Sequence, residues 1–192
     1  MAAKSNLKNM ALCLTLVCLL CSAVLGVVYA VTYEPIQVAA QKALEESIGK
    51  VLPAGGELSD AAIASFEGQT LEYYTSTANG TPVAYAVKSS TIGFGGPLTL
   101  MVGVLPDGTV YNTSVLTCNE TPGLGAKCQT DEAFMAQFHE LSPARVLKVT
   151  KDGGDIDAIT ASTITSRAYV EAVANAVSFV KSLASAAQNV EE

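Results

Sequence analysis

The hydrophobic residues are distributed unevenly, and the first long apolar run predicts a membrane-spanning helix. From Asn9 to Tyr33 the chain has no charged residue, and residues 10–31 are almost wholly apolar. A helix of about 20 such residues crosses a hydrocarbon core of about 30 Å. We therefore expect a transmembrane helix over residues 9–31.

The flanking charges predict how this helix is oriented. Lys4 and Lys8 precede the run, and no acidic residue occurs before Glu34. Basic residues stay on the cytoplasmic side, so residues 1–8 should be cytoplasmic and the remaining chain should lie on the periplasmic side of the inner membrane. The alternative is a signal peptide cleaved after Val28-Tyr29-Ala30, although its apolar core would exceed the usual ~7–15 residues.

Residues 32–67 form the predicted connection, a juxtamembrane helix followed by a linker. Apolar residues recur on one helix face at Ile36, Ala40, Leu44 and Ile48. Pro53 should end this helix, because a proline inside a helix removes a backbone hydrogen bond. Residues 54–67 are small and polar, which indicates a loop or a short helix.

Residues 68–192 should form one extracytoplasmic domain. Runs rich in Val, Thr and Tyr predict strands at residues 71–75, 82–90, 98–105, 110–116 and 146–150. A short helix is expected at residues 131–138. Apolar residues at three- and four-residue steps predict a terminal helix from Thr165 to about Ala187, with one face made of Val170, Val173, Val177, Val180 and Ala184. Strands followed by a closing helix indicate an α+β fold with a mostly antiparallel sheet.

The charge balance argues against nucleic acid as a partner. Beyond Lys4 and Lys8, nine of the 11 basic residues remain against 18 acidic ones, a balance of about −9. Such a surface repels phosphate backbones and offers no polybasic patch for anionic lipid. The single histidine, His139, has no nearby partner at a spacing typical of a metal site, so no metal is expected.

The five cysteines fall into two groups. Cys13, Cys18 and Cys21 lie in the apolar run, where a thiol packs as a small apolar side chain. Cys118 and Cys128 lie in the exported part of the chain, where a disulfide is chemically allowed. Spacing alone does not decide whether these two pair, so the bridged and the reduced forms both stay open.

A cluster of hydroxyls precedes the terminal helix. Asp157–Ser166 reads Asp-Ala-Ile-Thr-Ala-Ser-Thr-Ile-Thr-Ser. These residues lie where the helix should begin, and there the free N–H groups and the positive end of the helix dipole favour an anion such as a phosphate. An ordinary Ser/Thr helix cap is the alternative that local physics alone leaves open.

This segment resembles the flavinylation motif Asp-x-x-Ser/Thr-Gly-Ala-Ser/Thr-x-Thr in the FMN-binding domains of the RnfG and NqrC family. In that family FMN is joined through its phosphate to the last threonine, so the resemblance implies a phosphoester at Thr165. Asp157, Thr160 and Thr163 match the other polar positions. Ala161 stands where the family usually has Gly, and Ser162 where it usually has Ala.

Two further segments carry the same resemblance. Glu120-Thr121-Pro122-Gly123-Leu124-Gly125 is similar to the Glu-Thr-Pro-Gly-Leu-Gly signature of these domains, and Gly93-Phe94-Gly95-Gly96-Pro97 to their glycine turn. Pro-Gly is a turn signal, and Leu124 on a loop suits contact with a flat ring. Phe94 and Tyr111 are further candidate ring contacts. The implied cofactor-binding residues are Thr165, Thr163, Ser162, Ile164, Ser166, Thr160, Asp157, Glu120, Thr121, Leu124, Gly125, Gly95 and Gly96.

The resemblance implies a membrane-anchored redox subunit with no complete active site of its own. It would relay electrons through covalent FMN in an Rnf-type ferredoxin:NAD oxidoreductase that drives Na⁺ or H⁺ transport. Its partners would be the other membrane and peripheral subunits and, during maturation, a flavin transferase. The alternatives are an NqrC-type subunit of a Na⁺-translocating NADH:quinone reductase, a stand-alone flavin electron carrier, and a non-redox interaction module.

Overall fold

The computed structural model describes residues 7–188, which divide between Ala43 and Leu44 into two compact units. Lys4 and most of the predicted cytoplasmic segment lie outside the described residues. Within the described part, one helix is long and apolar enough to cross a membrane, namely α1 (Leu7–Val51).

In the first unit, α1 carries apolar side chains on all sides over residues 10–31. Its large side chains from Leu7 to Tyr33 are exposed, as expected of a helix whose partners are lipid or other chains. Pro35 lies inside the helix, where it lacks an N–H donor. The helix predicted up to Pro53 is present and ends at Val51.

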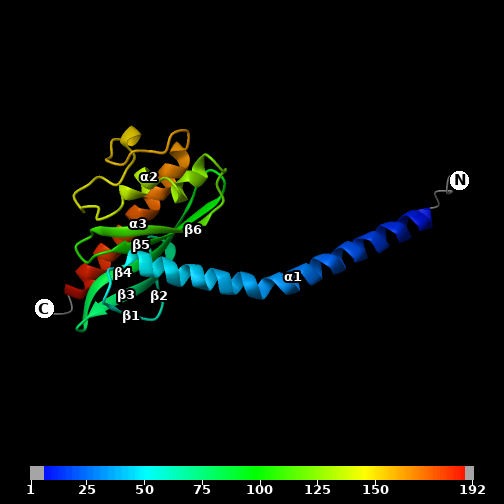
Figure 1. The fold of residues 1–192 in the computed structure, drawn as a ribbon, viewed down its shortest axis with the longest axis horizontal. Helices are drawn as coiled ribbons and strands as arrows, with labels where there is room; N and C mark the ends of the chain where they lie inside the picture. Colours follow the sequence, from blue (N-terminus) through cyan, green and yellow to red (C-terminus); the bar gives the residue numbers. More distant parts are fainter. Residues whose placement is uncertain (1–6, 189–192) are drawn as a thin grey trace. The chain divides into compact units, whose positions relative to one another are not determined.

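The second unit is built on a six-stranded antiparallel sheet (Figure 1). Its strands run in the order β1-β3-β4-β5-β6, and β2 also pairs with β3. The strands are β1 (Glu57–Leu58), β2 (Ala62–Phe66), β3 (Gln69–Ala78), β4 (Thr81–Ile92), β5 (Pro97–Val104) and β6 (Val110–Cys118). Four predicted strands correspond to β3–β6, and the predicted α+β fold class is confirmed.

The interpretation of residues 54–67 as a loop or short helix was wrong, because this segment forms β1 and β2. In β2 the exposed residues Ile63 and Ser65 alternate with partly buried ones, including Phe66. The Phe66 ring packs edge-on against Phe179, with the ring centroids 5.7 Å apart. Small side chains conceal the alternation in the sequence, and the long β3 edge supplies the pairing that makes it a strand.

The strand predicted at residues 146–150 was also wrong. Val149 makes only an isolated bridge to Ile156, and η2 (Thr150–Asp152), a 3₁₀ turn, follows at once. Both bridge partners are buried, with 1% and 0% of their surface exposed. The β-branched residues here therefore serve as core anchors for a loop, and no neighbouring strand extends the pairing.

The remaining helices are short except for the last. They are η1 (Gly125–Gln129), α2 (Glu132–Ala136) and α3 (Thr163–Gln188). Asp131 caps α2 by accepting a hydrogen bond from Phe134 N at 3.2 Å. The predicted terminal helix is confirmed, although α3 begins at Thr163, two residues before its predicted start.

The two faces of the sheet are covered by different helices. Alternate residues of β4 and β5, such as Val87 and Leu100, face the predicted apolar side of α3 in the main core. On the opposite face, Ile48 and Val51 at the end of α1 pack with Met101 in a smaller core. The last turns of α1 are therefore part of the folded domain.

Gly103 in β5 permits the close approach of the end of α1. A Cβ atom at this position would overlap the carbonyl oxygen of Val51 and would lie 3.0 Å from the Val51 side chain. Backbone cannot move away as easily as a side chain, so a methyl group here would force the helix end off the sheet.

We expect Gly103→Ala to destabilise the domain by about 1–3 kcal/mol, the usual cost of overpacking. The melting temperature of the purified chain should fall by ~2–10 °C. Gly49→Ala is the matched control: Gly49 lies in α1 with no atom within 4 Å of an added Cβ, so alanine should preserve or raise stability. Equal melting temperatures for Gly103→Ala and wild type would contradict the proposed contact.

Candidate functional site

A pocket of about 370 Å³ lies at one end of the sheet, where three segments meet. These segments are the turn between β4 and β5, the loop after β6, and the first turn of α3 with the two residues before it. Its lining residues are Phe94, Glu120, Thr121, Leu124, Gly125, Ala161, Ser162, Thr163, Ile164 and Thr165. The volume is in the range of small-molecule sites, which is about 300–1,000 Å³.

The start of α3 presents backbone N–H groups at this pocket. The first hydrogen bond of the helical i→i−4 type runs from Ser166 N to Ser162 O at 3.0 Å. The N–H groups of Thr163, Ile164 and Thr165 precede it, so they have no carbonyl of their own helix to bind. Together with the helix dipole they make this end of the pocket attractive to an anion.

The turn before α3 is held by Ser166 and requires an unusual backbone conformation. Ser166 Oγ accepts a hydrogen bond from Ile159 N and donates one to Ser162 O, both at 3.0 Å. Ala161 adopts a φ of +61°, in the left-handed region that a Cβ atom disfavours. The motif position that the family usually fills with glycine is therefore one at which glycine is the least strained residue.

Ser162 does not behave as an ordinary helix cap. Its side chain is only 6% exposed, and its Oγ has no hydrogen-bond partner among the residues described. A capping serine would accept a hydrogen bond from an N–H of the first turn. An unpaired buried hydroxyl costs free energy, so one that lines a pocket points to a ligand that supplies the missing hydrogen bond.

Thr165 lies deep in the pocket, with 1% of its surface exposed. Gly125 approaches it so closely that an added Cβ would lie 2.7 Å from Thr165 Oγ1 and 2.9 Å from Glu120 Cβ. Glycine at position 125 therefore leaves the space beside the Thr165 hydroxyl open. Thr165 is therefore buried although it lies in the first turn of a helix.

Glu120 joins two of the three segments. Its side chain is 8% exposed, and Oε1 accepts a hydrogen bond from Phe94 N at 2.8 Å. The partner lies 26 residues earlier in the chain. A buried carboxylate needs such partners, so this interaction ties the loop after β6 to the β4–β5 turn.

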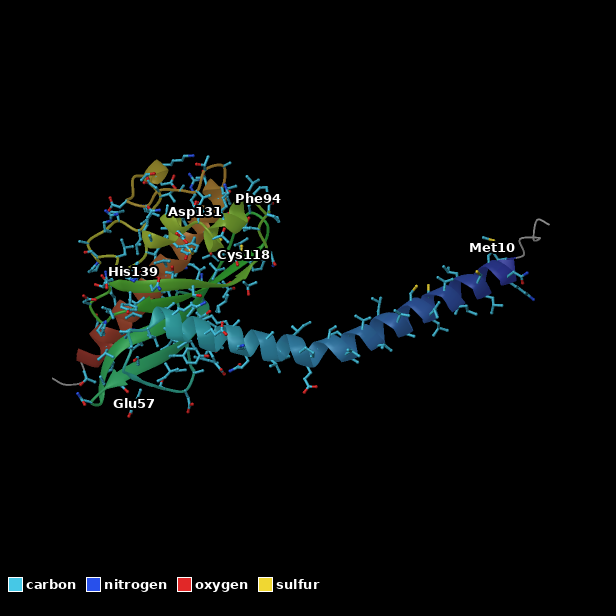
Figure 2. The ribbon with its side chains drawn as sticks, in the orientation of Figure 1. Met10, Glu57, Phe94, Cys118, Asp131 and His139 are labelled. Carbon is cyan, nitrogen blue, oxygen red and sulfur yellow. The ribbon has the colours of Figure 1, made fainter. Side chains whose placement is uncertain are left out.

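The pocket mouth carries exposed apolar side chains. Phe94 is 73% exposed, Ile164 51% and Leu124 45%, and each comes from a different segment. Figure 2 shows Phe94 at the end of the sheet that carries Cys118, in agreement with the pairing of Leu98 with Cys118 that follows the β4–β5 turn. Apolar groups around a concave site suit a flat aromatic ligand.

Two basic side chains lie beside the helix start. Lys151 Nζ donates a hydrogen bond to Thr163 Oγ1 at 3.2 Å. Arg167 binds both carboxylate oxygens of Asp152, at 2.6 and 2.7 Å, and these hydrogen bonds lower the pKa of Asp152. Because Arg167 is already paired, Lys151 is the cation that the geometry leaves for an anion at the motif.

Three aromatic rings in the main core pack against one another near the start of α3. Tyr169 is completely buried, and its ring centroid lies 5.1 Å from that of Phe134 and 4.8 Å from that of Phe138. Its hydroxyl shares a hydrogen bond of 2.7 Å with Thr113 Oγ1, and burial raises the pKa of Tyr169 to about 12. This cluster fixes the first turns of α3 against the sheet.

The structure brings together eight of the thirteen residues predicted for the site. Five lie elsewhere. Asp157 and Thr160 are exposed outside the pocket, Ser166 bonds within the preceding turn, and Gly95 and Gly96 form the β4–β5 turn against Asn119.

The structure differs from the sequence prediction at three further residues. Tyr111, a suggested ring contact, does not line the pocket, and its ring lies tilted beside that of His139 with the centroids 6.1 Å apart. Lys151 and the lining role of Ala161 were missed. The position of Ala161 inside the motif was a usable signal, whereas nothing near Lys151 in the sequence indicates its contact with Thr163.

Comparison with known families identifies the domain that contains this pocket. Residues 93–178 match the family model described as the FMN-binding domain. The matched region contains every lining residue of the pocket.

Characterised relatives match over most of the chain. The G subunit of the proton-translocating ferredoxin:NAD(+) oxidoreductase complex of Clostridium ljungdahlii is 33% identical over 167 residues, covering 85% of this chain and 86% of that protein. The G subunit of the ion-translocating oxidoreductase complex of Shewanella piezotolerans is 35% identical over 185 residues, covering 88% and 87%. That of Methanosarcina acetivorans is 34% identical over 169 residues, covering 83% and 88%.

Solved structures with a partial match include the C subunits of another reductase from two organisms. The C subunit of the Na(+)-translocating NADH-quinone reductase of Parabacteroides distasonis aligns with a TM-score of 0.44 at 24% identity, and NqrC of Shewanella oneidensis with 0.45 at 21%. The alignments cover 58% and 59% of this chain and 62% of each solved chain, which is less than two thirds of their length.

The family resemblance inferred from the three sequence segments is thereby confirmed. The identities exceed 30% over most of the chain, and the relatives are all G subunits of such complexes. The chain belongs to the RnfG family, the G subunits of ion-translocating oxidoreductase complexes, and residues 93–178 are its FMN-binding domain.

Proposed function

We propose that this chain is the flavoprotein subunit of an Rnf-type complex and that its FMN is joined through the phosphate to Thr165 Oγ1. One observation carries the proposal. The unpartnered hydroxyl of Ser162 and the buried Thr165 line one pocket at the N-terminus of α3. Phosphate chemistry at this point would satisfy both the hydroxyl and the free N–H groups.

The residues of the pocket fit the phosphate end of FMN. The N–H groups of the first turn of α3 would hold its oxygens, and Ser162 Oγ would donate the hydrogen bond that it lacks in the structure. Lys151, already 3.2 Å from Thr163 Oγ1, would supply a positive charge. If the threonine motif were only the helix cap of a non-redox module, the buried Ser162 hydroxyl would remain without a hydrogen-bond partner.

The opposite part of the pocket fits the ring. Leu124, Ile164 and Phe94 offer apolar surface, and Glu120 holds the loop that carries Leu124 in place. FMN, when bound, supplies the reversible electron transfer that protein side chains do not provide at moderate potentials. The chain's own role is to retain the cofactor and to limit its contact with water.

The setting of this redox site follows from the relatives and from α1. The relatives described as G subunits are parts of ion-translocating oxidoreductase complexes. We propose that α1 anchors this chain in the membrane beside the other subunits, with residues 1–8 cytoplasmic and the FMN domain on the periplasmic side. A flavin transferase would attach the cofactor there. The coupled reaction would be ferredoxin:NAD oxidoreduction driving Na⁺ or H⁺ transport.

The attachment site is tested by two substitutions at one position. Thr165→Val keeps the volume of a side chain that is 1% exposed but removes the hydroxyl, so it should abolish covalent flavin in a folded domain. Thr165→Ser keeps a hydroxyl and should retain covalent flavin. Coexpression with a flavin transferase, denaturation and intact-mass measurement give the flavin content of each variant.

Thr70→Val is the matched control for this test. Thr70 is exposed in β3 and lies outside both the pocket and the motif, so its variant should carry as much covalent flavin as wild type. Covalent flavin at the wild-type level in Thr165→Val would reject attachment at Thr165.

Ala161→Gly should stabilise the motif turn. Glycine removes the strain of a φ of +61°, and its larger unfolded-state entropy offsets part of the gain. The free energy of unfolding should therefore rise by up to ~1 kcal/mol, with flavin attachment preserved. Ala144→Gly, at an exposed loop position with no positive φ, should instead lower stability slightly. Urea unfolding measures the free energy of unfolding of both variants. An equal decrease in Ala161→Gly and Ala144→Gly would contradict backbone strain at Ala161.

Leu124→Asp should make the flavin harder to reduce. A carboxylate in the pocket lining opposes the added electron, and at a separation of ~8 Å with an effective dielectric constant of ~30 the midpoint potential should fall by ~20–60 mV. Covalent attachment should continue. Ile63→Asp adds the same charge at a residue that is 74% exposed and outside the pocket, so it should leave the potential unchanged in a redox titration. Equal midpoint potentials for Leu124→Asp and wild type would contradict the proposed position of Leu124 beside the flavin ring.

A further inference from the structure

Two cysteines lie in contact beneath the pocket. Cys118 ends β6 and Cys128 lies in η1, and their Sγ atoms are 3.7 Å apart. Both thiols are reduced in the structure. A disulfide requires an S–S distance of about 2.05 Å, so the two sulfurs need to approach by less than about 2 Å, a shift that side-chain rotation can provide.

The segment between these cysteines is part of the pocket wall. It contains Glu120, Thr121, Leu124 and Gly125, four of the lining residues. Between β6 and η1 the loop is held mainly by its own turns, such as Leu124 N to Thr121 O at 3.1 Å, and by the Glu120 bond to Phe94. A covalent link between its two ends would restrict this loop more strongly than these bonds do.

We propose that Cys118 and Cys128 form a reversible disulfide that locks the pocket loop in the arrangement described above. The bridge is a property of the pair itself and stands without a bound cofactor. That the locked loop flanks FMN rests on the proposed function.

The reaction is an exchange with an external disulfide, of the kind carried by a thiol:disulfide oxidoreductase or by oxidised glutathione. The Cys118 thiolate attacks one sulfur of the external disulfide, forms a mixed disulfide and releases one thiolate. The Cys128 thiolate then attacks Cys118 Sγ, forms the internal bridge and releases the second thiolate. Two electrons pass to the oxidant and two protons leave the pair.

The environments of the two thiols favour this order. Cys128 is completely buried, whereas Cys118 is half-buried and reachable. Burial, the neighbouring Cys118 and the Glu120 carboxylate raise the pKa of Cys128 to about 12. The first attack on a dissolved disulfide therefore falls to Cys118.

The test uses the full chain in detergent, prepared reduced and then treated with oxidised glutathione. Free thiols are then alkylated and the chain is analysed by peptide mapping. Cys118 and Cys128 should be found joined by a disulfide, whereas Cys13, Cys18 and Cys21 should be found alkylated. The melting temperature should rise by ~5–10 °C, as a closed loop of about ten residues implies. Locking of the loop is read by trypsin at Lys127, an exposed residue between the cysteines, where cleavage should slow at least fivefold relative to Arg145.

Two single variants provide the controls. Cys118→Ser, at the half-buried position, should lose the rise in melting temperature and the protection of Lys127. Cys21→Ser removes a thiol from α1 and should behave as wild type. Free thiols at both positions after treatment, glutathione retained on Cys118, or an equal rise in Cys118→Ser would each overturn the bridge.

The two proposals fail in different measurements. A bridge that forms without slowing cleavage at Lys127 would overturn the locking of the loop. Absence of covalent flavin by intact mass would overturn the flavin assignment, and the mapping, melting and proteolysis results would still decide on the disulfide.

Discussion

The burial of α3 against the sheet is the constraint on which the site depends. Tyr169 and Val173 are completely buried in the main core, and Thr91 Oγ1 donates a hydrogen bond to Ala168 O at 2.8 Å. Apolar burial of this extent determines the position of the helix along β4 and β5. The first turn of α3, with its free N–H groups, is thereby held at the end of the sheet where two loops meet.

The pocket is organised by few polar contacts among many small residues. Glu120 reaches Phe94, and Gly125 admits the Thr165 hydroxyl because it has no side chain. Each of these contacts joins segments that are far apart in the chain. The result is a pocket with a polar end at the motif and an apolar mouth, which matches the two chemically different halves of FMN.

An anion site in an acidic protein needs a local explanation. The chain carries a formal net charge of −7, which opposes phosphate at long range. At the motif the N-terminus of α3 and Lys151 supply positive potential, and Arg167 neutralises Asp152. The Glu120 carboxylate, which lines the same pocket, accepts a hydrogen bond from Phe94 N. Fields at contact distance exceed the screened field of remote charges, so the site can hold a phosphate that the surface as a whole would repel. The proposed covalent attachment would also remove the need for tight reversible binding.

The features that sequence reasoning captured are those set by neighbours along the chain. Periodicity predicted α3 and its buried valines, alternation and composition predicted β3–β6, and the apolar run predicted the part of α1 that can cross a membrane. The motifs Glu120–Gly125 and Asp157–Ser166 supply the eight pocket residues that sequence reasoning identified. They could be recognised in the sequence because the residues that form a turn or a helix start are consecutive.

Only the tertiary structure revealed the contacts between residues that are far apart in the sequence. Residues 57–66 became strands because the edge of β3 was available, although their composition is that of a linker. The contacts of Glu120 with Phe94, Lys151 with Thr163 and Cys118 with Cys128 join residues from different elements. Local patterns do not encode which distant segments will meet, because that depends on how the whole core buries its apolar surface.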